Sequence, residues 1–241
     1  MNLYRTLSGG KKQIAVLVDP DKYSAGRLID LATLAQGSGV SWFFVGGSLL
    51  TGGVVEETIR VLKNHSDIPV IIFPGDLLQI HPGADGILLL SLISGRNPEL
   101  LIGKHVVAAP YLKRSGLEIL PTGYMLIDSG SATTALYMSN SLPIPSGKPE
   151  IAASTAMAGE MLGLKLIYMD GGSGAEVPVP VNMVETVRKA IDIPLIVGGG
   201  IRDAEAARER FAAGADVIVV GNAIEEDHSF LTRLAEVALS F

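Results

Sequence analysis

The stretch 196-IVGGGIRDAEAARERFAAGADVIVVGNAI-224 decides the fold. It holds two apolar runs that both end in glycine, the first at residues 198–200 (GGG) and the second at residues 221–222 (GN). Between the runs, the spacing predicts a helix with Asp203 as its N-cap and Gly214 just after its end. The apolar runs show no polar alternation, which is typical of parallel strands buried on both faces.

The same unit repeats along the chain. Six further apolar runs predict strands over 14–19, 42–47, 70–75, 86–92, 124–130 and 166–172. The segment 98–120 contains VVAAPYL, which has the composition of a ninth strand, but we interpret it as a helical crossover kinked near Pro110. Eight alternating strand-helix units predict an α/β fold closed into a (β/α)8 TIM barrel. No linker-like segment divides the chain, so residues 1–241 are expected to form a single domain.

Composition narrows the functional classes. Hydrophobic residues make up 48% of the 241 residues and charged residues 18%, which indicates a globular chain. The net charge of −6 is spread along the sequence and argues against a nucleic-acid surface. The absence of cysteine excludes disulfides and cysteine metal sites. The N-terminal stretch has no signal-peptide pattern, and the longest apolar stretch, 84–93, is too short to span a bilayer, so we expect a cytoplasmic protein without a transmembrane segment.

The glycine clusters predict a phosphate site. In a TIM barrel the carboxyl ends of all strands meet at one face, where the loops build the active site. Glycines there let backbone N–H groups approach a ligand, and a following helix N-terminus favours an anion. The run at 168–175, YMDGGSGA, ends the sixth strand in the same way as the seventh and eighth strands. Tight turns alone would explain one such cluster, whereas three neighbouring clusters favour a phosphate.

Oxygen ligands gather on the opposite rim of the predicted mouth. Asp19 and Asp21 follow the first strand, and Ser48 follows the second. Carboxylate and hydroxyl oxygens suit Mg²⁺, which is commonly held by one or two carboxylates together with substrate phosphates. Asp19 is the better candidate because it directly ends its strand. The alternative is that both aspartates only cap or brace their loop.

Several motifs together resemble the geranylgeranylglyceryl phosphate synthase family, which shares a superfamily with the bacterial heptaprenylglyceryl phosphate synthases. In order, they are LVDPDK (17–22), FVGGS (44–48), SLISGRNPELLIGKH (91–105), YMDGGSGA, GGGIRD (198–203) and VVGNAI (219–224). The resemblance runs from about residue 12 to 227. It implies an Mg²⁺-dependent prenyltransferase in which sn-glycerol 1-phosphate attacks C1 of a long polyprenyl diphosphate, expected to be geranylgeranyl diphosphate, and pyrophosphate leaves. It further implies a homo-oligomer whose lipid product is handed to a membrane.

The resemblance also assigns roles to individual residues. Asp19 and Ser48 match the metal ligands. Asp170 matches the glutamate of the family's YLE motif, which makes it the candidate base with a side chain one methylene shorter. Leu17 stands where some relatives have the lysine of a KLDP motif. The glycerol phosphate would contact Tyr168, Met169, Asp170, Gly171, Gly172, Ser173, Gly174, Gly198, Gly199, Gly200, Gly221 and Asn222.

Two other functions remain open at this point. Asp19 and Asp128 end the first and fifth predicted strands, as the two acids do in aminoaldose isomerase barrels that act on phosphosugars. A flavin- or phosphate-binding barrel is the other alternative, because flavin mononucleotide also places its phosphate at the last two strands. A measured dependence on magnesium would argue against the isomerase, and a colourless purified protein would argue against the flavin.

Overall fold

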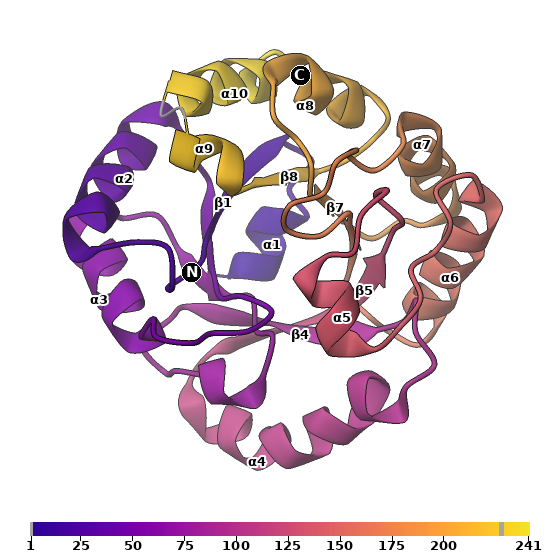
Figure 1. Cartoon of the computed structure of the whole chain (residues 1–241), viewed down its shortest axis with the longest axis horizontal. Helices are drawn as coiled ribbons and strands as arrows, with labels where there is room; N and C mark the ends of the chain where they lie inside the picture. Colours follow the sequence, from indigo (N-terminus) through magenta and orange to yellow (C-terminus); the bar gives the residue numbers. More distant parts are fainter. Residues whose placement is uncertain (1, 227–228) are drawn as a thin grey trace.

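The computed structural model describes residues 2–226 and 229–241. Eight parallel strands pair in sequence order and close into a barrel, with β8 against β1 (Figure 1). The predicted TIM barrel is therefore confirmed. The strands are β1 (Gln13–Val18), β2 (Trp42–Val45), β3 (Val70–Ile72), β4 (Gly86–Leu92), β5 (Glu118–Leu126), β6 (Leu166–Asp170), β7 (Leu195–Gly198) and β8 (Val217–Val220).

Most of the helices surround the barrel and cover its outer face, and a few short ones lie over its ends (Figure 1). The helices are α1 (Leu3–Leu7), α2 (Ala25–Ser38), α3 (Val55–His65), η1 (Leu77–Gln79), η2 (Glu99–Gly103), α4 (Lys104–Ser115), α5 (Thr134–Ser139), α6 (Pro149–Met161), α7 (Val181–Ala190), α8 (Ala204–Ala212), α9 (Asn222–Glu226) and α10 (Ser229–Leu239). None of the helices within the described ranges is long and apolar enough to cross a membrane.

The segment 98–120, part of which has the composition of a strand, is mostly helical, as predicted. It forms η2 and α4, and Pro110 lies inside α4. The following strand β5 begins at Glu118, earlier than the predicted start at Tyr124. Pro121, Thr122 and Gly123 interrupt the apolar pattern in the first part of β5, so the pattern predicts a strand only from Tyr124 onward.

The alternation of side chains along each strand builds two separate cores. In β2, Trp42 and Phe44 point into the barrel, whereas Phe43 and Val45 pack between the barrel and the helices. All four are fully buried. This double burial is why the strands appear in the sequence as unbroken apolar runs. The same alternation decides which residues at the strand ends face the interior of the mouth.

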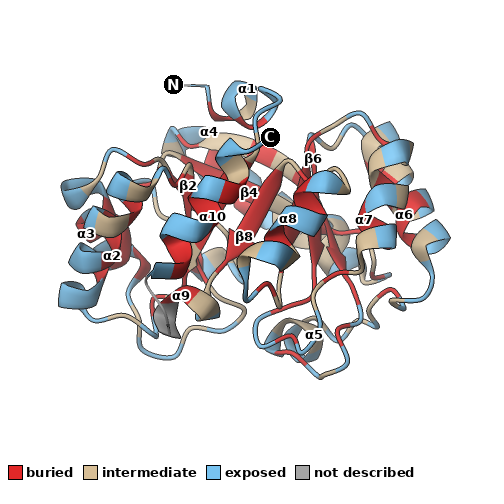
Figure 2. Cartoon of the chain, turned by 90° about the horizontal axis from the view of Figure 1, so that it is seen from above, coloured by how far each residue is buried: buried red, intermediate tan, exposed pale blue. Residues whose placement is uncertain are grey.

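The short helix α1 closes the amino-terminal end of the barrel. Leu3 and Leu7 are buried against the interior core, and both oxygens of the Glu118 carboxylate accept hydrogen bonds from the N–H groups of Leu3 (2.7 Å) and Tyr4 (2.8 Å). Figure 2 places α1 at one end of the molecule and α5 and α9 at the other. The carboxyl ends of the strands therefore form the open mouth.

Candidate active site

The loops after β6, β7 and β8 meet closely at the mouth. We call residues 171–174, 198–200 and 221–222 the phosphate cradle. The N–H of Gly171 donates to the carbonyl of Gly198 at 3.0 Å, which joins two of its loops. Gly199 has φ +83°, and a Cβ there would lie 2.7 Å from the nitrogen of Gly172. Glycine is therefore required at residue 199, both for the backbone conformation and for the approach of the two loops.

The members of the phosphate cradle differ in what they can offer a ligand. The N–H of Gly172 is already used, because it donates to Oδ1 of Asp170 at 2.7 Å. Ser173, Gly174 and Asn222 are exposed at the mouth. Gly221 lies beside Leu17, since a Cβ added there would be 3.6 Å from that of Leu17. The side chain at residue 17 is thus close to the cradle but brings no charge.

Met169, predicted to contact the glycerol phosphate, turns its side chain away from the mouth, so only its backbone is available for such a contact. Its side chain is fully buried in the core between the barrel and the helices. The reason is the strand alternation, which turns Met169 outward and its neighbours Tyr168 and Asp170 inward. Tyr168 belongs to the interior core, and its hydroxyl would be 2.6 Å from a Cβ at Gly198. Tyr168 therefore reaches the floor of the phosphate cradle.

Asp170 forms hydrogen bonds both to the phosphate cradle and to Tyr124 on the neighbouring strand β5. It is 6% exposed at the end of β6, where Oδ1 accepts the N–H of Gly172 and Oδ2 accepts the hydroxyl of Tyr124 at 2.5 Å. Burial raises the pKa of Asp170, and the two hydrogen bonds partly offset that rise. Burial and the neighbouring carboxylate raise the pKa of Tyr124 well above its usual value, so the hydroxyl stays protonated and donates. A buried carboxylate with a raised pKa has the properties of a general base.

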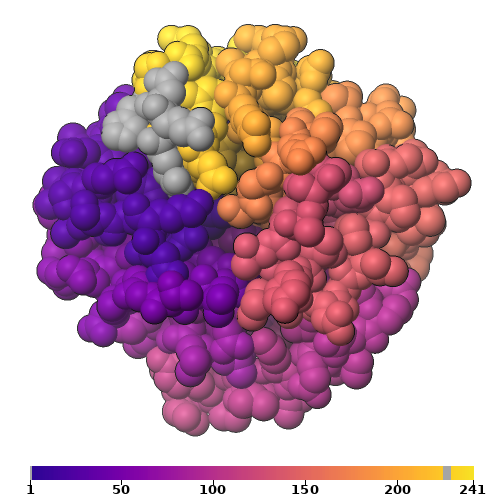
Figure 3. All heavy atoms as spheres, viewed as in Figure 1, coloured from indigo at the N-terminus to yellow at the C-terminus, as the bar shows by residue number. Residues whose placement is uncertain are grey.

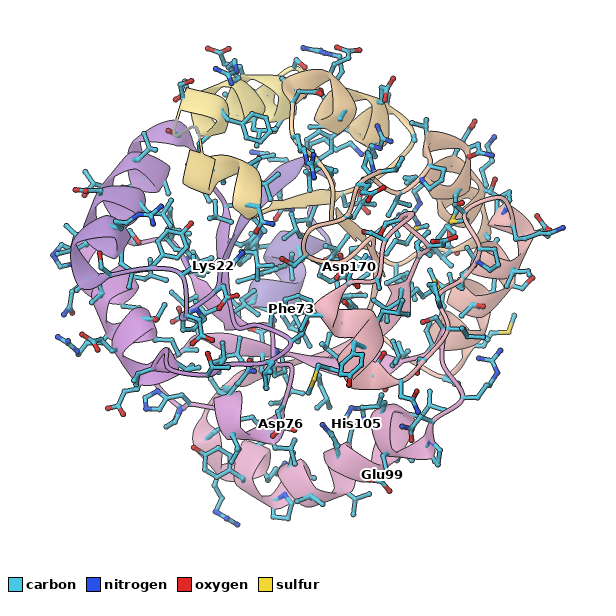
Figure 4. All side chains as sticks on the ribbon, viewed as in Figure 1. Lys22, Phe73, Asp76, Glu99, His105 and Asp170 are labelled. Atoms are coloured by element: carbon cyan, nitrogen blue, oxygen red, sulfur yellow. The ribbon has the colours of Figure 1, made fainter. Side chains whose placement is uncertain are left out.

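An aromatic cluster lies beneath this pair. The ring of Phe73 stacks on Tyr168 with centroids 5.1 Å apart, and its edge contact with Tyr124 spans 5.8 Å. Tyr124 and Tyr168 are paired across β5 and β6, so their rings meet nearly at right angles, 5.5 Å apart. In Figure 4, Phe73 and Asp170 both lie over the centre of the barrel. Within the cluster, Tyr168 lies under the phosphate cradle, whereas Phe73 and Tyr124 form an aromatic wall on the other side of Asp170.

A cavity of about 720 Å³ opens beside this wall, over β2, β3 and β4. Phe73 and Tyr124 line it at the barrel centre, and it extends outward past Asp76 and His105 to Ala108 on α4. Most of its wall is apolar; the lining residues include Leu49, Leu50, Val54, Val55, Leu77, Leu78, Ile80, Ile87, Leu89, Leu90, Leu92, Leu100 and Met138. Its size is typical of small-molecule sites.

Asp19 and Ser48 lie on neighbouring loops, as expected for a shared site. A Cβ at Gly47 would be 3.3 Å from Oδ1 of Asp19, so the carboxylate lies against the residue that precedes Ser48. Oδ1 accepts the N–H of Asp21 at 3.0 Å, and no described residue donates a hydrogen bond to Oδ2. Burial raises the pKa of Asp19. A half-buried carboxylate with an open oxygen, next to the loop that carries the Ser48 hydroxyl, is a suitable donor set for a hard cation.

Asp21 has a bracing role. It accepts hydrogen bonds from the N–H groups of Thr51 (2.7 Å), Gly52 (3.0 Å) and Gly53, and from the hydroxyl of Thr51. These bonds lower its pKa to about 2. Both oxygens are therefore used to hold the loop after β2 against the loop after β1. This is the alternative that the sequence left open, and it applies to Asp21.

The sequence did not single out three residues that shape the mouth: Phe73, Gln79 and Tyr124. The buried amide of Gln79 bonds the N–H of Gly47 (3.3 Å), the carbonyl of Gly47 (2.7 Å) and the N–H of Gly75 (3.2 Å), which fixes the loop that carries Ser48. Tyr124 falls within a predicted strand, but its partnership with Asp170 depends on the register of β5 against β6. An apolar run in the sequence predicts a strand but not its register against the neighbouring strand.

Asp128, the second acid of the isomerase alternative, does not lie within a strand. It follows β5, is exposed, and accepts the N–H of Gly130 in its own loop at 3.1 Å. Among the described residues, no group of three or more His, Asp or Glu side chains is arranged to hold a metal. The carboxylate that is buried at the mouth is Asp170.

Comparison with known proteins identifies the family. A sequence model described as the PcrB family matches residues 10–238. The chain belongs to the PcrB family. Among its relatives, a protein of Spirosoma linguale named geranylgeranylglyceryl phosphate synthase is 54% identical over 96% of this chain and 93% of its own length. A protein of the same name from Chitinophaga pinensis is 52% identical over 94% of this chain and 90% of its own length.

Solved structures of similar proteins share the whole fold. The (S)-3-O-geranylgeranylglyceryl phosphate synthase of Thermoplasma acidophilum, crystallised with its substrate sn-glycerol-1-phosphate, superposes with a TM-score of 0.93 at 33% identity, and the match covers 100% of both chains. The resemblance drawn from the sequence motifs is confirmed by these matches. The PcrB-family barrel described here places a phosphate cradle, a buried carboxylate and an apolar cavity at one mouth.

Proposed function

We propose that this chain is a geranylgeranylglyceryl phosphate synthase, which joins sn-glycerol 1-phosphate to a long polyprenyl diphosphate. The observation that carries the proposal is the position of Asp170 between two binding regions. Its Oδ1 lies on the side of the phosphate cradle, and its Oδ2 bonds Tyr124, which lines the apolar cavity. A phosphate-bearing polyol and an apolar chain would therefore meet at one carboxylate. The names of the relatives support the same activity.

The phosphate cradle would hold the glycerol phosphate by its anionic end. Backbone amides of glycine residues can approach phosphate oxygens without obstruction from a Cβ. Fixing the phosphate orients the far hydroxyl of the polyol toward Asp170, which converts a collision into a positioned attack. The proton of that hydroxyl passes to the Asp170 carboxylate as the new C–O bond forms. Each carboxylate oxygen has two acceptor positions, so the bonds from Tyr124 and Gly172 leave capacity for the substrate.

The cavity would hold the prenyl chain with its diphosphate toward the mouth. Its apolar lining suits an isoprenoid, and the expected donor is geranylgeranyl diphosphate. The aromatic wall of Phe73 and Tyr124 ends beside Asp170, so C1 of the donor would lie close to the attacking hydroxyl. The C1–O bond to the diphosphate breaks and pyrophosphate leaves with that electron pair.

Asp19 and Ser48 would hold a magnesium ion. When bound, the ion would neutralise the charge that develops on the leaving diphosphate. The fit rests on the open Oδ2 of Asp19, the adjacent loop of Ser48, and the raised pKa of Asp19, whose burial leaves its negative charge poorly solvated. Asp21 would act indirectly by bracing the loop, because its oxygens already accept four hydrogen bonds.

A direct assay tests the proposal. The purified chain is incubated with sn-glycerol 1-phosphate, prenyl diphosphates of several lengths and Mg²⁺, and the ether product is followed by chromatography and mass spectrometry. We expect product with geranylgeranyl diphosphate, little with sn-glycerol 3-phosphate, and none in the presence of a chelator. Absence of any ether product with every donor would contradict the proposal. The predicted homo-oligomer is checked on the same preparation by light scattering.

A further inference from the structure

Lys22 links the loop after β1 to the segment after β8, the neighbouring strand in the closed barrel. It belongs to the loop after β1, three residues after Asp19, and its ammonium donates to Oδ1 of Asn222 at 2.7 Å. Asn222 follows β8 and is part of the phosphate cradle. Figure 4 shows Lys22 close to the centre of the mouth, on the other side from Asp170. In the space-filling view, indigo atoms from the early part of the chain border yellow atoms from its last part near this centre (Figure 3).

The surroundings place this positive charge where an anion would bind. The hydrogen bond to Asn222 places the ammonium at the edge of the cradle, and its charge opposes the rise that burial causes in the pKa of Asp19. Leu17, the other side chain of this strand end that approaches the cradle, is apolar. On the far side, the guanidinium of Arg202 donates to the carbonyl of Ala175 at 3.1 Å and so ties two loops together. On the β1 side, Lys22 is a cation that hydrogen-bonds to a residue of the cradle.

We propose that Lys22 binds the phosphate group of sn-glycerol 1-phosphate directly and closes the phosphate cradle from the β1 side. This inference rests on the proposed function. An ammonium has three donors, so it can hold the amide oxygen of Asn222 and a phosphate oxygen at the same time. A charge-assisted bond to phosphate is stronger than a neutral amide contact, and lysine serves phosphate as a compact point charge. Lys22 thereby supplies the full positive charge that the backbone amides do not.

A purely structural role for Lys22 makes a different prediction. In that case Lys22 would only orient Asn222, and its removal would have no effect once the Asn222 side chain is absent. Direct contact with phosphate predicts instead that Lys22→Met weakens binding in the Asn222→Ala background as well. The two variants and their combination therefore separate contact from positioning.

The experiment is calorimetric titration of the full chain with sn-glycerol 1-phosphate and with inorganic phosphate, without Mg²⁺ or prenyl diphosphate. For the organic phosphate we expect Lys22→Met to weaken binding by about tenfold or more, as for the loss of a hydrogen bond to a charged group, and Lys22→Arg to retain most of the affinity. The control is Lys189→Met, which removes the same charge from the exposed outer face of α7, where Lys189 pairs with Glu185. Equal melting temperatures exclude unfolding as the cause.

Steady-state kinetics complete the test. For Lys22→Met we expect a raised KM for glycerol phosphate and an unchanged KM for the prenyl diphosphate. Unchanged glycerol phosphate affinity, no loss in the Asn222→Ala background, or a rise confined to the KM for the prenyl diphosphate would each overturn the inference. If the wild type binds neither probe, the inference is wrong. If it binds glycerol phosphate through Lys22 but forms no ether with any donor, the proposed function fails and the inference stands.

Discussion

Replacing Asp170 by Asn isolates the charge of the candidate base from its structural role. Oδ1 and Oδ2 of Asp170 both accept hydrogen bonds, from the fixed N–H of Gly172 and from the rotatable hydroxyl of Tyr124. An asparagine can keep its oxygen toward Gly172 and donate its NH₂ to Tyr124, whose hydroxyl turns round to accept. Asp170→Asn therefore keeps every hydrogen bond while it removes the ability to accept a proton.

The expected loss of rate follows from this substitution. A positioned general base contributes roughly 10²- to 10⁴-fold to the rate. This range corresponds to about 2.7–5.4 kcal/mol of barrier at 1.36 kcal/mol for each factor of ten. The free energy of unfolding, in contrast, should stay equal or increase in Asp170→Asn at neutral pH. Burial raises the pKa of the folded carboxyl, so its charged form costs stability above that pKa, and the cost fades as the pH falls toward the unfolded value.

Three measurements check this prediction: single-turnover rates, calorimetric binding of sn-glycerol 1-phosphate, and thermal melting at several pH values. We expect a rate at least about 100-fold lower, glycerol phosphate affinity close to that of the wild type, and a melting temperature that is equal or higher at neutral pH, with the gain shrinking in acid. An undiminished rate would remove Asp170 from the mechanism. A large fall in melting temperature would show instead that the carboxylate is needed for folding.

Three further predictions test the other parts of the mouth. Asp19→Asn should abolish turnover and leave sn-glycerol 1-phosphate binding intact, and an active variant in a magnesium titration would refute the metal assignment. Gly199→Ala should lose glycerol phosphate affinity in calorimetry, because the added Cβ would lie 2.7 Å from a cradle nitrogen. Its control is Gly163→Ala, which has φ +87° and no neighbour within 4 Å of the added Cβ, so equal losses in both variants would count against the cradle. Tyr124→Phe removes a hydrogen bond that lowers the pKa of Asp170, so the acid limb of kcat/KM for glycerol phosphate should move to higher pH; an unmoved limb would mean that the pair is not coupled in catalysis.

The sequence predicts those parts of the site that depend on backbone position. Strand ends of a closed barrel meet at one face whatever their side chains, so Gly199, Asp170 and Asp19 could be assigned to the mouth from the order of the runs alone. The side-chain direction at a strand end is less accessible. The YMDGGSGA motif groups Met169 with the predicted ligand-binding residues, whereas strand alternation turns its side chain into the core between the barrel and the helices. The alternation of side chains along a strand gives the direction of Met169 once one inward-facing residue of β6 is known.

Contacts between strands depend on information that no single segment contains. Tyr124 meets Asp170 because β5 and β6 pair Tyr124 with Tyr168, and a shift of register by one residue would turn the tyrosine to the other face of the sheet. Lys22 meets Asn222 because β8 closes on β1, which brings residues from opposite ends of the chain together. Strand pairing thus creates the first of these contacts and barrel closure the second. Residues that act through such pairs have to be found in the structure, while residues that act through glycine backbone can be found in the sequence.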